Sequence, residues 1–197
     1  MHEKLWQQLT AEPDYSVTAK RAACGYQPDP DRLRIKFLNT DYTVIPGEML
    51  ITSEIASRPG FLEQLCILAY LISARDTAPE GRLVKAESLP GGQFFFRGPH
   101  LLPTAQLEKA FGRDPQVLHR AGRALNAADG RFGDASIEVD ILPRVTVVFI
   151  IWAEDEEFPA RASILFDSGV HRQIPLDALW TAVKQTAKIL VKQKNAS

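Results

Sequence analysis

Residues 135–167 read ASIEVDILPRVTVVFIIWAEDEEFPARASILFD, and this stretch decides the fold class. Apolar and polar residues alternate over 135–141, which is the period of a strand with one buried face. Residues 145–152 are apolar on both faces and rich in β-branched side chains, so they predict the central strand of a sheet. Residues 161–167 predict a third strand after the acidic turn at 154–159. The three strands together predict an antiparallel meander.

Two long helical patterns lie before and after the predicted meander. Residues 60–74 are apolar on nearly all faces, so we expect a central core helix with Cys66 packed inside it. Residues 176–192 have amphipathic spacing, with Lys184, Lys188 and Lys192 along the polar side. Lysines near the end of a helix complement its dipole, and a basic face can also contact an anionic partner.

Shorter elements fill the rest of the sequence. We expect a helix over 15–24 between an Asp14 cap and Gly25, and then strands at 33–37, 42–45 and 49–51. Thr104 is expected to cap a helix that ends at Phe111, and a further helix opens at 114–115. The paired glycines of 89–96 predict a turn that enters a short strand.

The predicted fold class is α+β, an antiparallel sheet with helices packed mainly on one face. We expect residues 1–197 to form a single domain. Its parts are N-terminal helices and a hairpin, a central helical part, and a C-terminal three-stranded meander plus helix.

Composition excludes several classes of protein. Lys and Arg number 23 against 24 Asp and Glu, so no overall charge attracts nucleic acid or anionic membranes. Two cysteines are too few for a disulfide framework or a four-cysteine metal centre. The chain has neither a signal-like start nor an apolar run long enough for a membrane helix, so we expect a soluble, cytoplasmic protein.

Motifs of known chemistry are absent from the sequence. It has no phosphate-binding loop, dinucleotide fingerprint, zinc-protease motif or nucleophile elbow. The four histidines lie in four different segments, and no metal site is predicted. The acidic run 154–157 lacks the spacing of a calcium-binding loop, so a solvated turn is the simpler interpretation. The sequence leaves the cofactor open.

One group of side chains stands out on the meander. If the acidic turn closes near 156–157, Trp152 lies opposite Arg161 and Ile150 opposite Ser163 on one sheet face. The neighbouring strand adds carboxylates to that face. The predicted ligand-binding residues are therefore Trp152, Arg161, Asp140, Glu138 and Ser163. Two interpretations stay open: a shallow pocket in which Trp152 stacks a planar ligand and Arg161 fixes an anionic group, or a solvent-facing sheet surface.

The segments LPGG at 89–92, GD at 133–134, DEEFPA at 155–160 and ILFD at 164–167 also carry a resemblance. With them the chain resembles an uncharacterised prokaryotic family, domain of unknown function thirty-seven eighty-six. Some members carry an extra four-cysteine iron–sulfur module, which two cysteines cannot supply here. The resemblance implies a link to anaerobic corrinoid or iron–sulfur metabolism, with a protein partner in one-carbon or redox metabolism, and implies no catalytic residues.

The resemblance directs attention to motif residues whose roles are open: Asp134, Asp155, Glu157, Phe158 and Asp167. We expect most of them to determine the fold, with Phe158 plugging the hairpin end.

Three hypotheses for function follow. The first is a non-catalytic ligand-binding or accessory module that uses the Trp152 face. The second is an enzyme of unrecognised type, with Asp134, Asp140, Asp155 or His171 as acid or base. The third is a homo-oligomeric scaffold with the aromatic segment 94–96 as its interface, and the sequence leaves the oligomeric state open.

Overall fold

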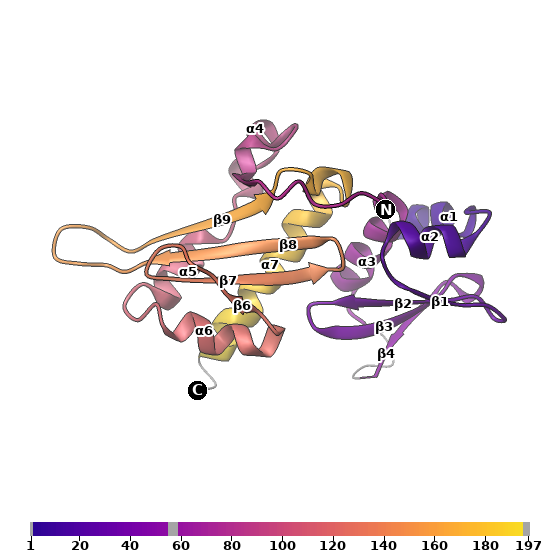
Figure 1. Ribbon diagram of the computed structural model, residues 1–197, viewed down its shortest axis with the longest axis horizontal. Coiled ribbons are helices and arrows are strands. Elements are labelled where there is room, and N and C mark those ends of the chain that lie inside the picture. Colours follow the sequence, from indigo (N-terminus) through magenta and orange to yellow (C-terminus); the bar gives the residue numbers. More distant parts are fainter. Residues whose placement is uncertain (1, 55–58, 195–197) are drawn as a thin grey trace.

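The computed structural model describes residues 2–54 and 59–194, and it confirms the α+β class (Figure 1). The helices are α1 His2–Thr10, α2 Tyr15–Arg21, α3 Phe61–Ser73, α4 Gly92–Phe95, α5 Thr104–Phe111, α6 Val117–Gly122 and α7 Leu176–Lys194. The strands are β1 Gly25–Gln27, β2 Arg32–Phe37, β3 Thr40–Ile45, β4 Leu50–Ser53, β5 Leu83–Lys85, β6 Ala128–Asp129, β7 Ala135–Leu142, β8 Val145–Trp152 and β9 Arg161–Asp167.

The strands form two antiparallel sheets. The larger has the order β5-β9-β8-β7-β6, which confirms β8 as its central strand. Its register confirms the predicted pairs Trp152 with Arg161 and Ile150 with Ser163. The smaller sheet has the order β1-β2-β3-β4. Its strands β2, β3 and β4 correspond to those expected at 33–37, 42–45 and 49–51, whereas β1 was not expected.

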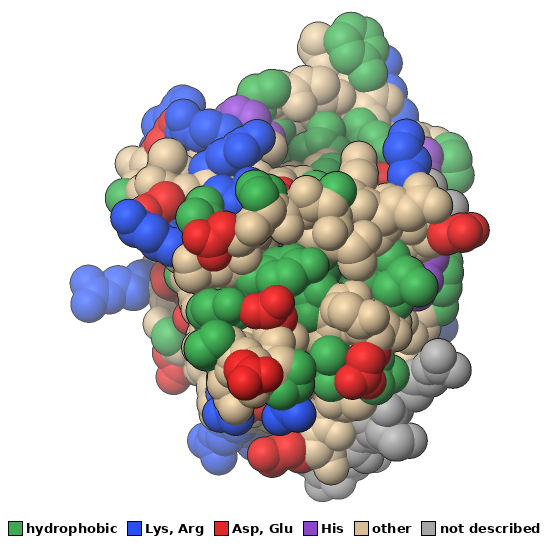
Figure 2. All heavy atoms as spheres, turned by 90° about the vertical axis from the view of Figure 1, so that its right-hand side faces the viewer, with side chains coloured by type: hydrophobic (Ala, Val, Ile, Leu, Met, Phe, Trp, Pro, Cys, Tyr) green, Lys and Arg blue, Asp and Glu red, His purple; other side chains and the backbone are tan. Residues whose placement is uncertain are grey.

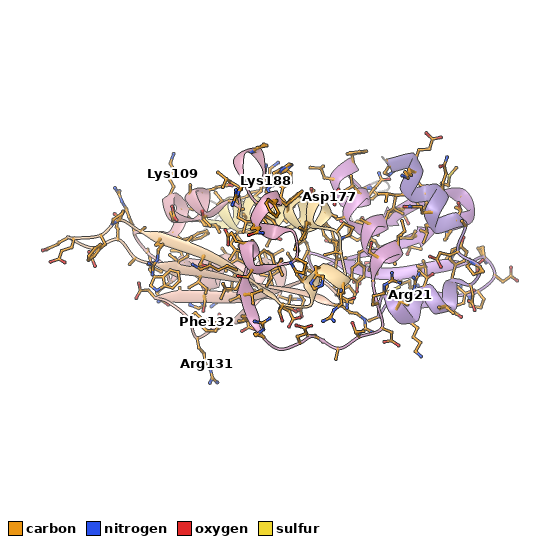
Figure 3. The ribbon with its side chains drawn as sticks, turned by 90° about the horizontal axis from the view of Figure 1, so that it is seen from above. Arg21, Lys109, Arg131, Phe132, Asp177 and Lys188 are labelled. Atoms are coloured by element: carbon orange, nitrogen blue, oxygen red, sulfur yellow. The ribbon has the colours of Figure 1, made fainter. Side chains whose placement is uncertain are left out.

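Helices α5, α6 and α7 cover one face of the larger sheet (Figures 1 and 3). Helix α3 packs between α7 and α1, and every residue from Leu65 to Leu71 is buried, which confirms the predicted central helix. Its first turn is different, because Phe61 and Leu62 remain 57% and 50% exposed. The prediction of burial on nearly all faces is therefore correct for the middle of α3 but not for its first turn.

A loop over residues 130–134 covers part of the other face of the larger sheet. Ser136 is buried beneath it, accepting a hydrogen bond on Oγ from the Phe132 N–H (2.9 Å) and one on its carbonyl from the Gly130 N–H (2.8 Å). Ile150 is also buried on this side. The strand β7 is therefore less polar on its second face than its sequence predicts, because Ser136 is removed from solvent.

Several short elements differ from their predictions. Helix α2 ends at Arg21, and Ala23, at φ 48°, takes the left-handed conformation expected of Gly25. Thr104 is the first residue of α5 and provides no side-chain cap. Residues 92–95 form the short helix α4 instead of a strand, which leaves Phe94 74% exposed while Phe96 is buried.

The two sheets are joined by contacts and by a continuous core. The N–H of Leu38, just after β2, donates to the Ile141 carbonyl of β7 (3.1 Å). The Arg144 guanidinium, in the turn between β7 and β8, donates to the Arg21 carbonyl of α2 (2.9 Å) and to Asp76 after α3 (2.7 Å), and so ties the larger sheet to the N-terminal helices. Buried residues of both sheets belong to one hydrophobic cluster. The end of the molecule beside the smaller sheet carries charges of both signs among apolar side chains (Figure 2).

Candidate functional site

The loop that joins β8 to β9 forms the far end of the larger sheet (Figure 1). Beside it lies a pocket of about 580 Å³. We call it the hairpin pocket, and it is lined by Asp134, Trp152, Ala153, Asp155, Phe158, Pro159, Ala160 and Arg161. Five of these eight side chains are apolar and three are charged, which is the mixed lining typical of a small-molecule site.

Asp155 shapes the loop from within. Its Oδ1 accepts hydrogen bonds from the N–H groups of Glu157 (2.8 Å) and Phe158 (2.7 Å), and its own N–H donates to the Phe158 carbonyl (3.0 Å). An aspartate that bonds the backbone two and three residues ahead stabilises a turn. The carboxylate of Asp155 therefore serves the loop conformation.

Residues near the end of α5 anchor the same loop from outside. The Glu154 N–H donates to the Gly112 carbonyl (3.0 Å), and the Glu154 carboxylate pairs with Arg113 (3.1 Å). Glu108 accepts from the Ala162 N–H (3.0 Å), and so satisfies a donor of β9 that no neighbouring strand reaches. Part of the acidic turn is thus neutralised and fixed to the body of the protein.

Asp134 forms the side of the pocket nearest β7. Its Oδ2 accepts from the Ala153 N–H (2.8 Å), and its N–H donates to the Ile151 carbonyl (2.9 Å). The preceding Gly133 has φ +59°, and a Cβ there would lie 2.6 Å from the Ile151 carbonyl oxygen. Only glycine permits so close an approach of the loop to β8.

Arg161 lies across the indole of Trp152, with its guanidinium carbon 4.4 Å from the ring centroid. Trp152 of β8 and Arg161 of β9 are directly opposite each other in the sheet, so the stacking follows from the register of the two strands. Within residues 2–54 and 59–194, no carboxylate lies within ion-pair distance of this guanidinium. Its donors therefore remain available to a ligand.

The other three predicted ligand-binding residues lie away from this pair. Asp140 pairs with Thr146 at the opposite end of β8, about 20 Å from Trp152 at the rise of a strand, and accepts from the Thr146 hydroxyl (2.6 Å). Glu138 is exposed opposite Val148. Ser163 lines a separate cavity of about 200 Å³ beside β5. The register places these three on the same sheet face as Trp152 and Arg161, as the sequence predicts, but none of them lines the hairpin pocket.

The remaining motif residues have distinct places. Phe158 is 65% exposed, so the prediction that it plugs the hairpin end is wrong: the loop projects beyond the sheet instead of folding onto it. Glu157 is exposed in the same loop. Asp167 ends β9, where its carboxylate accepts from the N–H groups of Glu80 (3.1 Å), Gly81 (2.7 Å) and Gly169 (2.9 Å). Asp167 thus holds the segment before β5 in place.

The acid–base candidates do not form a joint site. Asp134 and Asp155 line one pocket but bind backbone N–H groups, and His171 Nδ1 lies 3.0 Å from the Ser168 carbonyl. A histidine–carboxylate pair that sequence reasoning missed joins His119 of α6 to Asp129 of β6, at 2.6 Å. Their separation of ten residues, across a helix end and a turn, gave no motif that would have revealed it. No cluster of three metal-binding side chains occurs in the described parts of the chain.

The two thiols lie in apolar surroundings. Burial raises the pKa of Cys66 to about 12, with a smaller effect from Asp177, and raises the pKa of Cys24 to about 11. A thiol with a raised pKa holds little of the reactive thiolate near neutral pH. The Cys66 Sγ is also within 3.6 Å of the Ala178 carbonyl, inside the core.

One further charged cluster holds the segment before β5. The Ser168 hydroxyl donates to Glu80 (2.5 Å), and Arg172 forms an ion pair with the same carboxylate. The Ser168 hydrogen bond, followed by the charge of Arg172, lowers the pKa of Glu80. The cluster lies at the opposite end of β9 from the hairpin pocket and joins the segment before β5 to the residues that follow β9.

These features define an α+β domain with a mixed apolar and charged pocket at one end of its larger sheet. The family model described as Domain of unknown function (DUF3786) matches residues 14–188, and the chain belongs to this family. The resemblance of the motif segments is thereby confirmed. No curated protein and no solved structure matches the chain.

Within the described residues, no helix is both long enough and apolar enough to span a membrane.

Proposed function

We propose that this chain is a non-catalytic binding module whose hairpin pocket takes a ligand with a flat ring and an anionic group. The observation that carries the proposal is the Arg161 guanidinium, which lies 4.4 Å over Trp152 and has no carboxylate partner among the described residues. Arginine binds carboxylates and phosphates through paired hydrogen bonds. The ring would contact the wall made by Trp152, Phe158 and Pro159 while the acid group pairs with Arg161.

Binding is favoured over catalysis because the acidic side chains of the pocket already serve the backbone. Asp134 and Asp155 hold the ends of the loop through N–H groups of Ala153, Glu157 and Phe158. A general base must instead reach a proton of the substrate. In this pocket the carboxylates of Asp134 and Asp155 therefore hold the loop, and the guanidinium of Arg161 is the charged group that a ligand can bind. A protein partner in one-carbon or redox metabolism, which the family resemblance implied, stays a prediction.

The test uses 1-naphthoate, a flat ring with a carboxylate, and 1-naphthalenemethanol, its uncharged counterpart. The chain has three tryptophans, so the indole N–H signals in a nitrogen-15 spectrum separate Trp152 from Trp6 and Trp180, with Trp152→Phe as the assignment control. We expect naphthoate to shift the Trp152 signal. Arg161→Gln should weaken naphthoate binding by about tenfold or more, the effect of one hydrogen bond to a charged group.

The matched control is Arg120→Gln, which removes the same charge from an exposed arginine of α6 that lies outside the pocket lining. It should leave naphthoate affinity unchanged, and the uncharged alcohol should bind both variants and wild type alike. The proposal fails if the Trp152 signal stays still at millimolar naphthoate, or if Arg161→Gln binds naphthoate as well as wild type does.

A further inference from the structure

A second surface, independent of the hairpin pocket, lies on the outer side of the helices. It is a groove of about 800 Å³ between α3, α5 and α7, which we call the lysine groove. Leu62, Trp180 and Ile189 form its apolar part, and Lys184, Lys188 and Lys192 follow one another along it. Figure 3 shows Lys188 on the helical side of the molecule, opposite Arg131 and Phe132.

The three lysines are positioned at intervals of four residues, so they lie on one face of α7. All three are exposed, and none forms an ion pair within residues 2–54 and 59–194. Like charges at this spacing destabilise a helix. Favourable interaction with the helix dipole reaches only the last turn, where Lys192 lies, and leaves Lys184 and Lys188 unexplained.

The groove also contains exposed apolar surface that folding has not buried. Leu62 is 50% exposed on the first turn of α3, and Trp180 is only partly buried. Lys184 lies 4.3 Å from the centroid of the Trp180 ring, which holds that charge beside the apolar strip. The acid in the lining, Glu63, is engaged with the Gly60 N–H (2.6 Å). Exposed apolar side chains bordered by charge are typical of an interaction surface.

We propose that the lysine groove docks an acidic amphipathic helix of a partner protein. From Trp180 to Lys192 the groove follows α7 for about 18 Å, the length of about three helical turns. A helix laid in it would place apolar residues on Leu62, Trp180 and Ile189, and glutamates or aspartates against the lysines. A nucleic acid would satisfy the lysines but leave the apolar strip without a partner.

The test uses the full chain and a fluorescent helical peptide of about 14 residues, with leucines on one face and glutamates beside them. A scrambled peptide of the same composition, without an apolar face, is its control. We expect the ordered peptide to bind, to shift the Trp180 indole signal, and to lose affinity when salt is raised to about 1 M. The double variant Lys184→Glu with Lys188→Glu should weaken binding at least about tenfold.

Two controls make the result specific. Lys109→Glu makes the same charge change on α5, on the same side of the molecule but outside the groove lining, and should bind like wild type (Figure 3). A peptide with lysines in place of glutamates should bind the double variant, which shows that its groove is intact. Equal binding of the ordered and scrambled peptides, or unchanged affinity in the double variant, would overturn the proposal. So would lysine-dependent binding of RNA or anionic vesicles without binding of the ordered peptide.

Discussion

The carboxylate of Asp134 accepts a hydrogen bond of 2.8 Å from the backbone N–H of Ala153, and so ties the entrance of β7 to the exit of β8. The carbonyl of Asp134 also accepts from the Gln116 side chain (2.9 Å), just before α6. One residue therefore joins a strand, a hairpin and a helix at the hairpin pocket. Its loss should affect the stability of the fold as well as the pocket.

We expect Asp134→Ala to lower the free energy of unfolding by about 1 to 3 kcal/mol, because the Ala153 N–H loses a charged acceptor. Asp134→Asn keeps an acceptor oxygen and should cost less than half as much. Urea unfolding of the three proteins measures the difference. The control is Glu138→Ala, which removes an exposed carboxylate from β7, the strand that follows Asp134, and should change stability by less than about 0.5 kcal/mol. Equal losses for Asp134→Ala and Asp134→Asn would contradict this role.

The sequence predicts the meander well because its periodicity is strong and its connections are short. Residues 145–152 are almost all apolar, and six of these eight residues are buried, as expected of a central strand. The register of β8 with β9 then follows from the length of the loop, and it places Arg161 on Trp152. This part of the candidate site was therefore accessible from local pattern alone.

The sequence predicts Glu138 and Asp140 on the same sheet face as Trp152, and the register agrees, but the irregularity in β7 that keeps Asp140 on that face was not predictable. An irregularity between Asp140 and Leu142 changes the register, so that Asp140 pairs with Thr146 and Ala135 with Ile151. A regular two-residue turn would pair Asp140 with Val147 and turn its side chain to the other face. No local residue pattern predicts this irregularity. The exposure of Phe158 was also not predictable from local sequence. The direction of its loop depends on contacts with residues far away in the sequence, such as the hydrogen bond from the Glu154 N–H to the Gly112 carbonyl.

Gly133→Ala should destabilise the protein more than a typical surface substitution. The residue has φ +59°, and an added Cβ would lie 2.6 Å from the Ile151 carbonyl oxygen and 2.8 Å from Ile150 Cγ2. Left-handed backbone and a steric overlap together should cost about 2 kcal/mol or more. Thermal and urea unfolding measure the loss. The matched control is Gly47→Ala, where a Cβ meets nothing within 4 Å, and there stability should hold or rise slightly. A stable Gly133→Ala would show that the loop can move off β8.

Glu80 should make stability depend on acid pH. Its pKa is lowered in the folded state by the Ser168 hydroxyl and then by Arg172, so the stabilisation is present above the unfolded pKa and disappears as pH falls through the folded pKa. Glu80→Gln should therefore be less stable than wild type at pH 7, and the gap should narrow as the pH falls below about 4.3, the ordinary pKa of a glutamate, and close below the lowered folded-state pKa. The urea unfolding midpoints of both proteins, measured at pH 7 and at a series of lower pH values, test this prediction. Glu87→Gln, an exposed carboxylate in the short turn after β5, is the control and should show no such convergence. A gap that is constant with pH would mean that Glu80 acts through shape alone.

The two thiols, Cys66 buried and Cys24 partly buried, should make the protein less stable at alkaline pH. The pKa of Cys66 is about 12 and that of Cys24 about 11 in the folded protein, against about 8.5 for a free thiol. The folded state thus holds these protons more tightly. The stabilisation is complete below about pH 8.5 and declines as pH rises toward the folded values, by up to about 1.4 kcal/mol per pH unit for each group.

Cys66→Ala removes one of these groups, so its unfolding free energy should fall less steeply between about pH 9 and 10 than that of wild type, even if it starts lower because of the smaller side chain. Urea unfolding at closely spaced pH values gives both slopes. Gln106→Ala, an exposed change on α5 without an ionisable group, should keep the wild-type slope. Identical slopes for Cys66→Ala and wild type would mean that the thiol ionises as easily in the core as in water, which its burial against the Ala178 carbonyl argues against.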